Sequence, residues 1–126
     1  MSIPKVVMRY GISGEARGGG LPRLVQSGDL EYETTIEDTI LDLDEAGVYL
    51  FFGVATNKNT DAYSSMRTTQ ITSQTGEKFG VEKAKLQNIL SDGTQRVSLT
   101  ANTDGTVTLK PSDVLYHVRY TIYKMA

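Results

Sequence analysis

The residues that most often perform acid–base or nucleophilic chemistry are scarce in this sequence. His117 is the only histidine, cysteine is absent, and no serine–aspartate pair accompanies His117 at a recognisable spacing. The usual zinc ligand sets need cysteines or several histidines, so they are excluded as well. We therefore predict that His117 is a polar residue on the outward face of a strand, and that the protein is not an enzyme.

Seven of the 15 acidic residues lie between positions 31 and 45, and no two of them stand out as an acid–base pair. Glycoside hydrolysis requires two carboxylates that face each other across the substrate. Residues 42–47, DLDEAG, have Asp at the first and third positions and Gly at the sixth, as in a calcium-binding loop. The twelfth position is Gly53, where that loop needs a glutamate. We interpret the carboxylates as a solvated acidic surface and predict no metal ion and no other cofactor.

Residues 11–29, GISGEARGGGLPRLVQSGD, are rich in glycine. The segment lacks the Lys-Ser or Lys-Thr ending of a phosphate-binding loop, and it offers no strand–turn–helix setting for a dinucleotide. Three consecutive glycines leave the backbone without a local preference. We predict a flexible arm or exposed loop that becomes ordered on a partner. The candidate assembly residues of this arm are Arg17, Gly18, Gly19, Gly20, Leu21 and Arg23.

The charge balance argues against two classes of partner. The chain has 13 basic and 15 acidic residues and a net charge of −2, so no long-range field attracts nucleic acid or an anionic membrane. No apolar run approaches the roughly 20 residues of a membrane-spanning helix, and the first ten residues lack the apolar core of a signal peptide. We therefore predict neither nucleic-acid binding nor membrane insertion.

Alternation of apolar and polar side chains predicts the elements that position these residues. Residues 47–56, GVYLFFGVAT, form the most apolar segment, which predicts a central strand buried on both faces. Residues 62–74 alternate with little apolar content, as an outer strand would. Two alternating runs enclose Asp104-Gly105, and this arrangement predicts a β-hairpin.

The segment VLYHVRYTIYKMA, residues 114–126, alternates almost without interruption. One face is wholly apolar or aromatic and consists of Val114, Tyr116, Val118, Tyr120 and Ile122. We predict that this face points into the core. A strand of this apolar character is expected to be paired on both sides, deep within a sheet.

Two further segments are compatible with either a helix or a strand. In residues 32–45, the helical spacing of Ile36, Ile40 and Leu43 competes with an alternation of leucine and aspartate. The alternation favours a strand for residues 39–44. Residues 79–90 fit a strand or a short helix equally well.

The chain length of 126 residues fits one domain. Short strands, regular turns and no clear long helix predict an all-β fold, an antiparallel β-sandwich or jelly roll. We expect residues 1–126 to form this single domain, with residues 11–29 as its glycine-rich N-terminal arm or loop. Residues 1–10 could add a strand that begins near Pro4.

Two motifs resemble those of known virion proteins. The segment DEAGVYLFFGVAT is similar to a strand in trimeric jelly-roll heads of the tumour-necrosis-factor and complement-head kind, and in bacteriophage fibre tips. The segment YHVRYTIYKM resembles the strand that often ends bacteriophage tail-fibre, baseplate or head-decoration proteins. The resemblance implies a virion structural protein, made in the host cytoplasm. It also implies a homo-oligomer, with a trimer favoured, that contacts other virion proteins and a host surface glycan.

Surface recognition is the function class that remains. Tyrosine and arginine are typical interface anchors, because they combine a large contact area with polar tips. The candidate surface-binding residues are Tyr63, Arg67, Arg119, Tyr123 and Lys124. One alternative is a carbohydrate-binding module or adhesin domain, which predicts a row of aromatic rings on one sheet face. Another alternative is a small β-barrel enzyme. The lack of paired acid–base residues in the sequence argues against this alternative.

Overall fold

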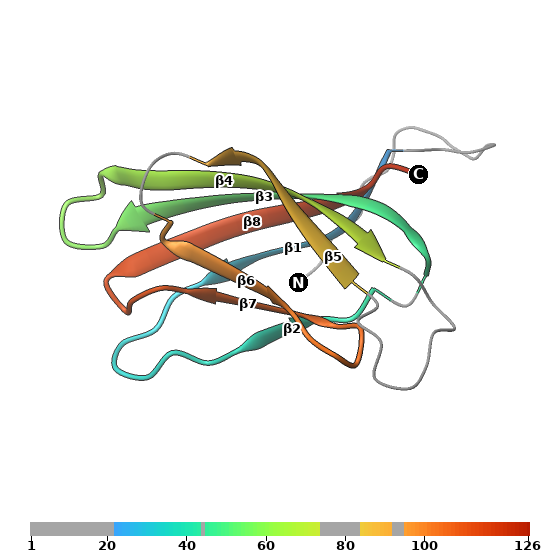
Figure 1. Cartoon of the computed structure of the whole chain (residues 1–126). Coiled ribbons are helices and arrows are strands. Elements are labelled where there is room, and N and C mark those ends of the chain that lie inside the picture. Colours follow the sequence, from blue (N-terminus) through green and yellow to red (C-terminus); the bar gives the residue numbers. More distant parts are fainter. Residues whose placement is uncertain (1–21, 44, 74–83, 92–94) are drawn as a thin grey trace.

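The computed structural model describes residues 22–43, 45–73, 84–91 and 95–126. Within these ranges the chain forms antiparallel sheets of five and three strands and no helix. The strands are β1 (Arg23–Leu30), β2 (Thr39–Leu41), β3 (Gly47–Asn57), β4 (Tyr63–Ser73), β5 (Ala84–Ser91), β6 (Val97–Ala101), β7 (Val107–Pro111) and β8 (Tyr116–Lys124). Figure 1 shows the smaller sheet lying across one face of the larger. The predicted all-β antiparallel sandwich is confirmed.

The strand order combines local hairpins with long-range pairing. The larger sheet has the order β1-β8-β3-β4-β5, and the smaller sheet has the order β2-β7-β6. Strands β3, β4 and β5 follow one another in the chain, and β8 returns to lie beside β3, which is a Greek-key arrangement. The position of β8 between β1 and β3 confirms that the last strand is paired on both sides.

The core lies between the sheets and is built from alternate residues of each strand. The larger sheet contributes Tyr49, Phe51, Ala55, Ile71, Tyr116, Val118, Tyr120 and Ile122, all of them buried. The smaller sheet contributes Leu41, Val97, Leu99, Val107 and Leu109. The predicted inward face of the last strand is thereby confirmed from Tyr116 to Ile122, whereas Val114 lies in the turn before β8 and is only half-buried. Burying a large apolar side chain stabilises a fold by about 1.5–3 kcal/mol, so this cluster is the main source of stability.

Two glycines make room for aromatic rings on the inner face of the larger sheet. Tyr120 is paired with Gly28 on one side and with Gly53 on the other. A Cβ atom at Gly28 would lie 3.0 Å from the Tyr120 ring, and one at Gly53 would lie 2.7 Å from the Phe51 ring. The rings of Phe51 and Tyr120 stack with their centroids 6.0 Å apart. These strand glycines therefore serve packing, by permitting a close approach.

The loop predicted for residues 11–29 is wrong at its C-terminal end, because Arg23–Leu30 form β1. Glycine and aspartate disfavour strands on propensity alone. Here pairing with β8 and the ring over Gly28 override that preference. Residues 1–21, which include the rest of the predicted arm and the strand considered for residues 1–10, lie outside the described residues.

The strand predicted for residues 47–56 is central, as β3, but it is not buried on both faces. Tyr49, Phe51 and Ala55 point into the core, whereas Phe52 on the opposite face is 38% exposed. The smaller sheet covers only the inner face of the larger sheet. Among the described residues, no second layer covers the outer face.

The outer strand predicted for residues 62–74 is also corrected, because β4 lies between β3 and β5. Its low apolar content is explained by buried polar side chains that find hydrogen-bond partners. The Ser73 hydroxyl donates to the carbonyl oxygen of Leu43 at 3.1 Å, and the Thr69 hydroxyl is 3.0 Å from Asn88 Oδ1.

Neither ambiguous segment contains a helix where the structure describes it, and in residues 32–45 only the middle of the segment is a strand. Residues 39–41 form β2, and the part of the other segment that is described forms β5. The predicted hairpin is confirmed as β6 and β7. Its turn places Gly105 at a φ of 93°, and the N–H of Thr106 donates to the Asp104 carboxylate at 3.0 Å. The described residues contain no helix capable of crossing a membrane.

Candidate interaction surface

The outer face of the larger sheet carries apolar side chains in three adjacent rows. The strand register places Leu24, Tyr123 and Leu50 in one row across β1, β8 and β3. Phe52 and Leu90 lie in the next row, on either side of Thr68. Val54 and Met66 are paired in the row after that. We call these residues the outer apolar patch: Leu24, Leu50, Phe52, Val54, Met66, Leu90 and Tyr123.

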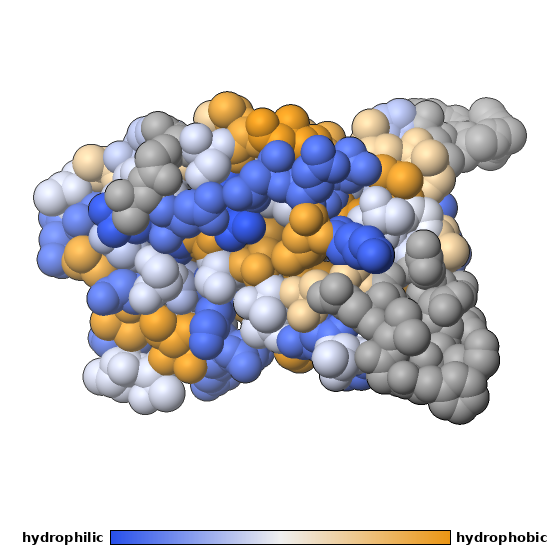
Figure 2. Space-filling view, viewed as in Figure 1, coloured by the Kyte–Doolittle hydropathy of each residue, from blue (hydrophilic) through white to orange (hydrophobic). Residues whose placement is uncertain are grey.

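This patch is exposed at its centre and along the β5 edge. Phe52 is 38% exposed, Leu90 is 49% exposed, and the adjacent Ile89 is 56% exposed. The polar Thr68 between Phe52 and Leu90 is only 7% exposed. Figure 2 shows apolar atoms along the upper margin of the molecule, above the end of β5. An exposed apolar area of this kind usually marks an interaction site.

Two aromatic rings of the patch meet at right angles. The centroids of Phe52 and Tyr123 are 6.2 Å apart, and their planes are inclined by 80°. This edge-to-face contact fixes both rings and is worth about 0.5–1.5 kcal/mol beyond their burial. Because the rings are not coplanar, they do not form a flat platform on which successive sugar rings could stack.

A charged cluster borders the patch on β1 and β8. Asp29 Oδ1 lies 3.3 Å from His117 Nε2 and 3.5 Å from Arg119 Nε. The Arg119 side chain is 75% exposed, whereas the His117 side chain is largely covered. His117 is on the outward face, as predicted. Together with its partner Asp29 it forms part of a polar rim around the patch. Interfaces typically combine such a rim with an apolar centre.

Three of the five predicted surface-binding residues share this outer face. Tyr63 is exposed at the start of β4 and is paired with Thr56, which faces outward beside His117. Arg119 belongs to the charged cluster, and Tyr123 belongs to the patch. Arg67 and Lys124 instead point to the inner side of the larger sheet, since their partners Gly53 and Tyr49 are inward-facing.

Arg67 connects strands of both sheets from its half-buried position. Its Nε donates to Thr69 Oγ1 and to Asn88 Oδ1, each at 3.0 Å, and its Nη1 donates to the Val97 carbonyl oxygen at 2.9 Å. Desolvation by burial lowers the pKa of the Arg67 guanidinium. A side chain held by β4, β5 and β6 in this way positions the strands and is not free to bind a partner.

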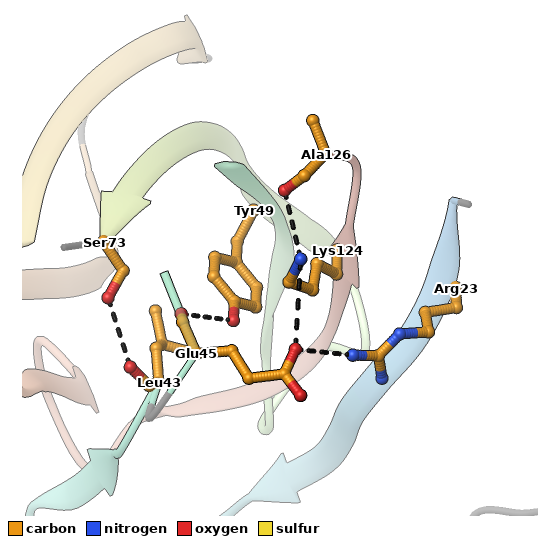
Figure 3. A network of polar contacts seen from close by, with 7 residues as sticks. All are labelled: Arg23, Leu43, Glu45, Tyr49, Ser73, Lys124 and Ala126. Carbon is orange, nitrogen blue, oxygen red and sulfur yellow. Dashed lines mark hydrogen bonds and ion pairs between the residues drawn. The ribbon is translucent and has the colours of Figure 1, made fainter. Parts of the chain in front are cut away.

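Lys124 belongs to a network that joins the β2–β3 connection to the larger sheet (Figure 3). Glu45 lies 3.0 Å from Arg23 and 3.9 Å from Lys124. The Lys124 ammonium also lies 5.9 Å from the centroid of the Tyr49 ring, and the Tyr49 hydroxyl donates to the Glu45 carbonyl oxygen at 2.9 Å. Arg23, predicted as an assembly residue, therefore makes an ion pair within its own chain.

The sequence prediction missed most of the outer apolar patch. The signal is present in the sequence, because Val48, Leu50, Phe52 and Val54 lie on one face of the strand predicted for residues 47–56. The prediction of burial on both faces is wrong for this face, because periodicity does not reveal whether a second layer covers it. Arg17, Gly18, Gly19, Gly20 and Leu21 of the predicted assembly arm lie outside the described residues.

The described part of the chain holds no group of three or more His, Cys, Asp or Glu side chains that could bind a metal ion. Comparisons with protein-family models, with curated proteins and with solved structures gave no match.

Proposed function

We propose that this protein is a structural component that acts by association, and that it forms a homo-oligomer through the outer apolar patch. The observation that carries the proposal is the set of apolar side chains in adjacent rows from Leu24 across β8 and β3 to Leu90, on a sheet face with no covering layer among the described residues. An apolar centre bordered by Asp29 and Arg119 has the composition of a protein–protein interface.

The setting we propose is a bacteriophage virion. Two motifs support it, one that resembles a strand of fibre-tip heads and one that resembles the last strand of tail-fibre, baseplate or head-decoration proteins, as does the β-sandwich in which they lie. In this proposal the chain is made in the host cytoplasm and is incorporated into the particle beside other virion proteins. The resemblance to trimeric jelly-roll heads favours a trimer, and a closed cyclic assembly would cover the exposed surface of each copy equally.

Light scattering coupled to size-exclusion chromatography tests the association. We expect the wild-type chain to have a molar mass that is a multiple of the monomer mass. The double variant Phe52→Ser/Leu90→Ser removes the two most exposed patch residues and should lower the mass to that of a monomer. Negative-stain electron microscopy of the wild-type assembly should show threefold averages.

The matched control is Ile40→Ser. Ile40 is 52% exposed on β2, in the smaller sheet, so this substitution removes a comparable apolar side chain away from the patch. The control should keep the wild-type mass. A wild-type chain that stays monomeric at high concentration would contradict the proposal, and so would equal effects of the control and the double variant.

A further inference from the structure

The edge of β1 that lies away from β8 offers a second site of association. Among the described residues, β1 pairs with β8 alone, and it is a terminal strand of the larger sheet. After the irregularity at Val25, residues 26–30 keep a regular register with β8. A regular edge exposes unpaired backbone N–H and C=O groups, and such an edge readily accepts another strand.

The strand at the opposite end of the sheet is less suitable. β5 has an irregularity near Ile89 and carries Lys85, and it contacts β6 of the smaller sheet. Figure 1 shows β5 running diagonally across the sandwich towards β6. A bulge, a lysine and a covering strand are the usual means by which a protein blocks an edge. The regular stretch of β1 contains no proline or lysine.

The chain itself contains a segment that matches the edge of β1. Residues 3–10, IPKVVMRY, are equal in length to β1, which has 8 residues. Alternate positions of the segment are apolar throughout: Pro4, Val6, Met8 and Tyr10. The intervening positions are Ile3, Lys5, Val7 and Arg9, which include two cations. In an extended conformation the segment would present one wholly apolar face and one mixed face that carries both cations.

The faces of β1 are complementary to this pattern. Gln26, Gly28 and Leu30 point inward, opposite the buried residues of β8, and Ser27 and Asp29 point outward. The Asp29 side chain is 66% exposed, so its carboxylate is open to a further cation beside Arg119. A strand with its apolar face inward would extend the core and would place Lys5 and Arg9 on the side of Asp29.

We propose that residues 3–10 of a second copy of this chain add to this edge of β1 as a further antiparallel strand. The inference rests on the proposed homo-oligomer. Residues 11–22, which separate the segment from β1, exceed the two to five residues of common hairpin loops, so no tight turn favours pairing within one chain. Association through the outer apolar patch raises the effective concentration of the neighbouring segment.

Disulfide trapping with the full chain tests this inference. Because the chain has no native cysteine, any disulfide must join the introduced cysteines. Single variants Lys5→Cys, Val7→Cys and Arg9→Cys, which would face outward, are each mixed with Ser27→Cys under mild oxidation. We expect at least one mixture to give a covalent heterodimer on non-reducing gels, with several-fold more product than the inward controls Val6→Cys and Met8→Cys.

The outcomes separate this inference from the proposed function. Heterodimers from an outward position support exchange between copies. An intramolecular disulfide in the dilute double variant Val7→Cys/Ser27→Cys would show that the segment pairs within one chain. If the mixtures then give no heterodimer, the proposed strand exchange is overturned. Absence of any disulfide would overturn the strand exchange as well. If the wild-type chain is oligomeric and Phe52→Ser/Leu90→Ser is monomeric while no bond forms, the proposed function stands without the strand exchange.

Discussion

Gly53 and Gly28 determine how the largest side chains of the core lie. Each glycine faces an aromatic ring at a distance that a real Cβ atom would not tolerate without movement. Phe51 is fully buried and stacks on Tyr120, whose hydroxyl accepts a hydrogen bond from Gln26 at 2.9 Å. The rings therefore have little freedom to move away from an added methyl group.

We expect Gly53→Ala to lower the free energy of unfolding by about 1–3 kcal/mol, because it overpacks a filled core. Denaturant unfolding followed by tyrosine fluorescence would measure the change. Thr100→Ala, at an exposed position of β6, is the control and should stay within about 0.5 kcal/mol of the wild type. An equally small effect of Gly53→Ala would mean that the Phe51 ring can shift.

Arg67→Lys is the informative substitution at the half-buried arginine. A lysine ammonium cannot reproduce the planar fork that reaches Thr69, Asn88 and the Val97 carbonyl oxygen. We expect a loss of about 1–3 kcal/mol in the free energy of unfolding, close to that of Arg67→Ala. If lysine restores wild-type stability, the positive charge alone matters and the geometry described here does not.

The pH dependence of Arg67 follows from its lowered pKa. Burial disfavours the charged guanidinium in the folded state. At a pH below the folded-state pKa, burying this charge therefore lowers the free energy of unfolding. The loss disappears only when the pH rises through that pKa, in the alkaline range. Arg67 should therefore contribute no step to the stability profile around neutral pH.

At the level of strands and turns, the local features were predicted best. The β6–β7 hairpin follows from Asp104-Gly105 and two alternating runs, because a tight turn and its flanking strands are encoded within a few residues. The position of β4 could not be predicted in the same way. Its buried hydroxyls and Arg67 depend on partners from β5, β6 and the β2–β3 connection, which are distant in the sequence.

Gly105→Ala tests the hairpin turn. A φ of 93° is disfavoured for any residue with a side chain, and Gly105 is buried. We expect a loss of about 1–3 kcal/mol in unfolding free energy. The neighbouring exposed Thr103→Ala should be nearly neutral, and thermal unfolding of both variants would show whether the strain is specific to position 105.

The connection between β2 and β3 should depend more on Ser73 than on Glu45. Ser73 is buried and donates to the Leu43 carbonyl oxygen, so Ser73→Ala should cost about 1–2 kcal/mol. The Arg23–Glu45 pair is about half exposed on both sides, and such pairs contribute about 0–1 kcal/mol. Unfolding curves at low and high salt should show a small, screened loss for Glu45→Gln. A larger effect of Glu45→Gln than of Ser73→Ala would reverse this ranking.

In the protein as a whole, β8 joins the earliest described strand to the middle of the chain. Gln26 of β1 and Tyr120 of β8 are 94 residues apart in the sequence and are in direct contact. The alternation in β8 predicted its inward face, and its apolar character predicted two neighbours. Periodicity does not reveal that these neighbours are β1 and β3, because the choice of neighbours depends on the topology of the whole fold.

Long-range pairing of this kind predicts slow folding. Chains dominated by contacts between distant residues fold in about milliseconds to seconds, because loop closure precedes most of the stabilising contacts. Stopped-flow refolding followed by tyrosine fluorescence should therefore give a main phase in that range. A microsecond main phase would indicate that local hairpins alone form the transition state.

The place of β8 also suggests how the protein could be divided. A fragment that ends before residue 114 would retain β1 and β3 without the strand between them, and a synthetic peptide of residues 114–126 carries the inward row from Tyr116 to Ile122. Because that peptide would gain hydrogen-bonding partners along both of its edges, the two pieces should reconstitute one fold when mixed. The protein could then serve as a split reporter, in which a short tag restores the missing centre of a sheet.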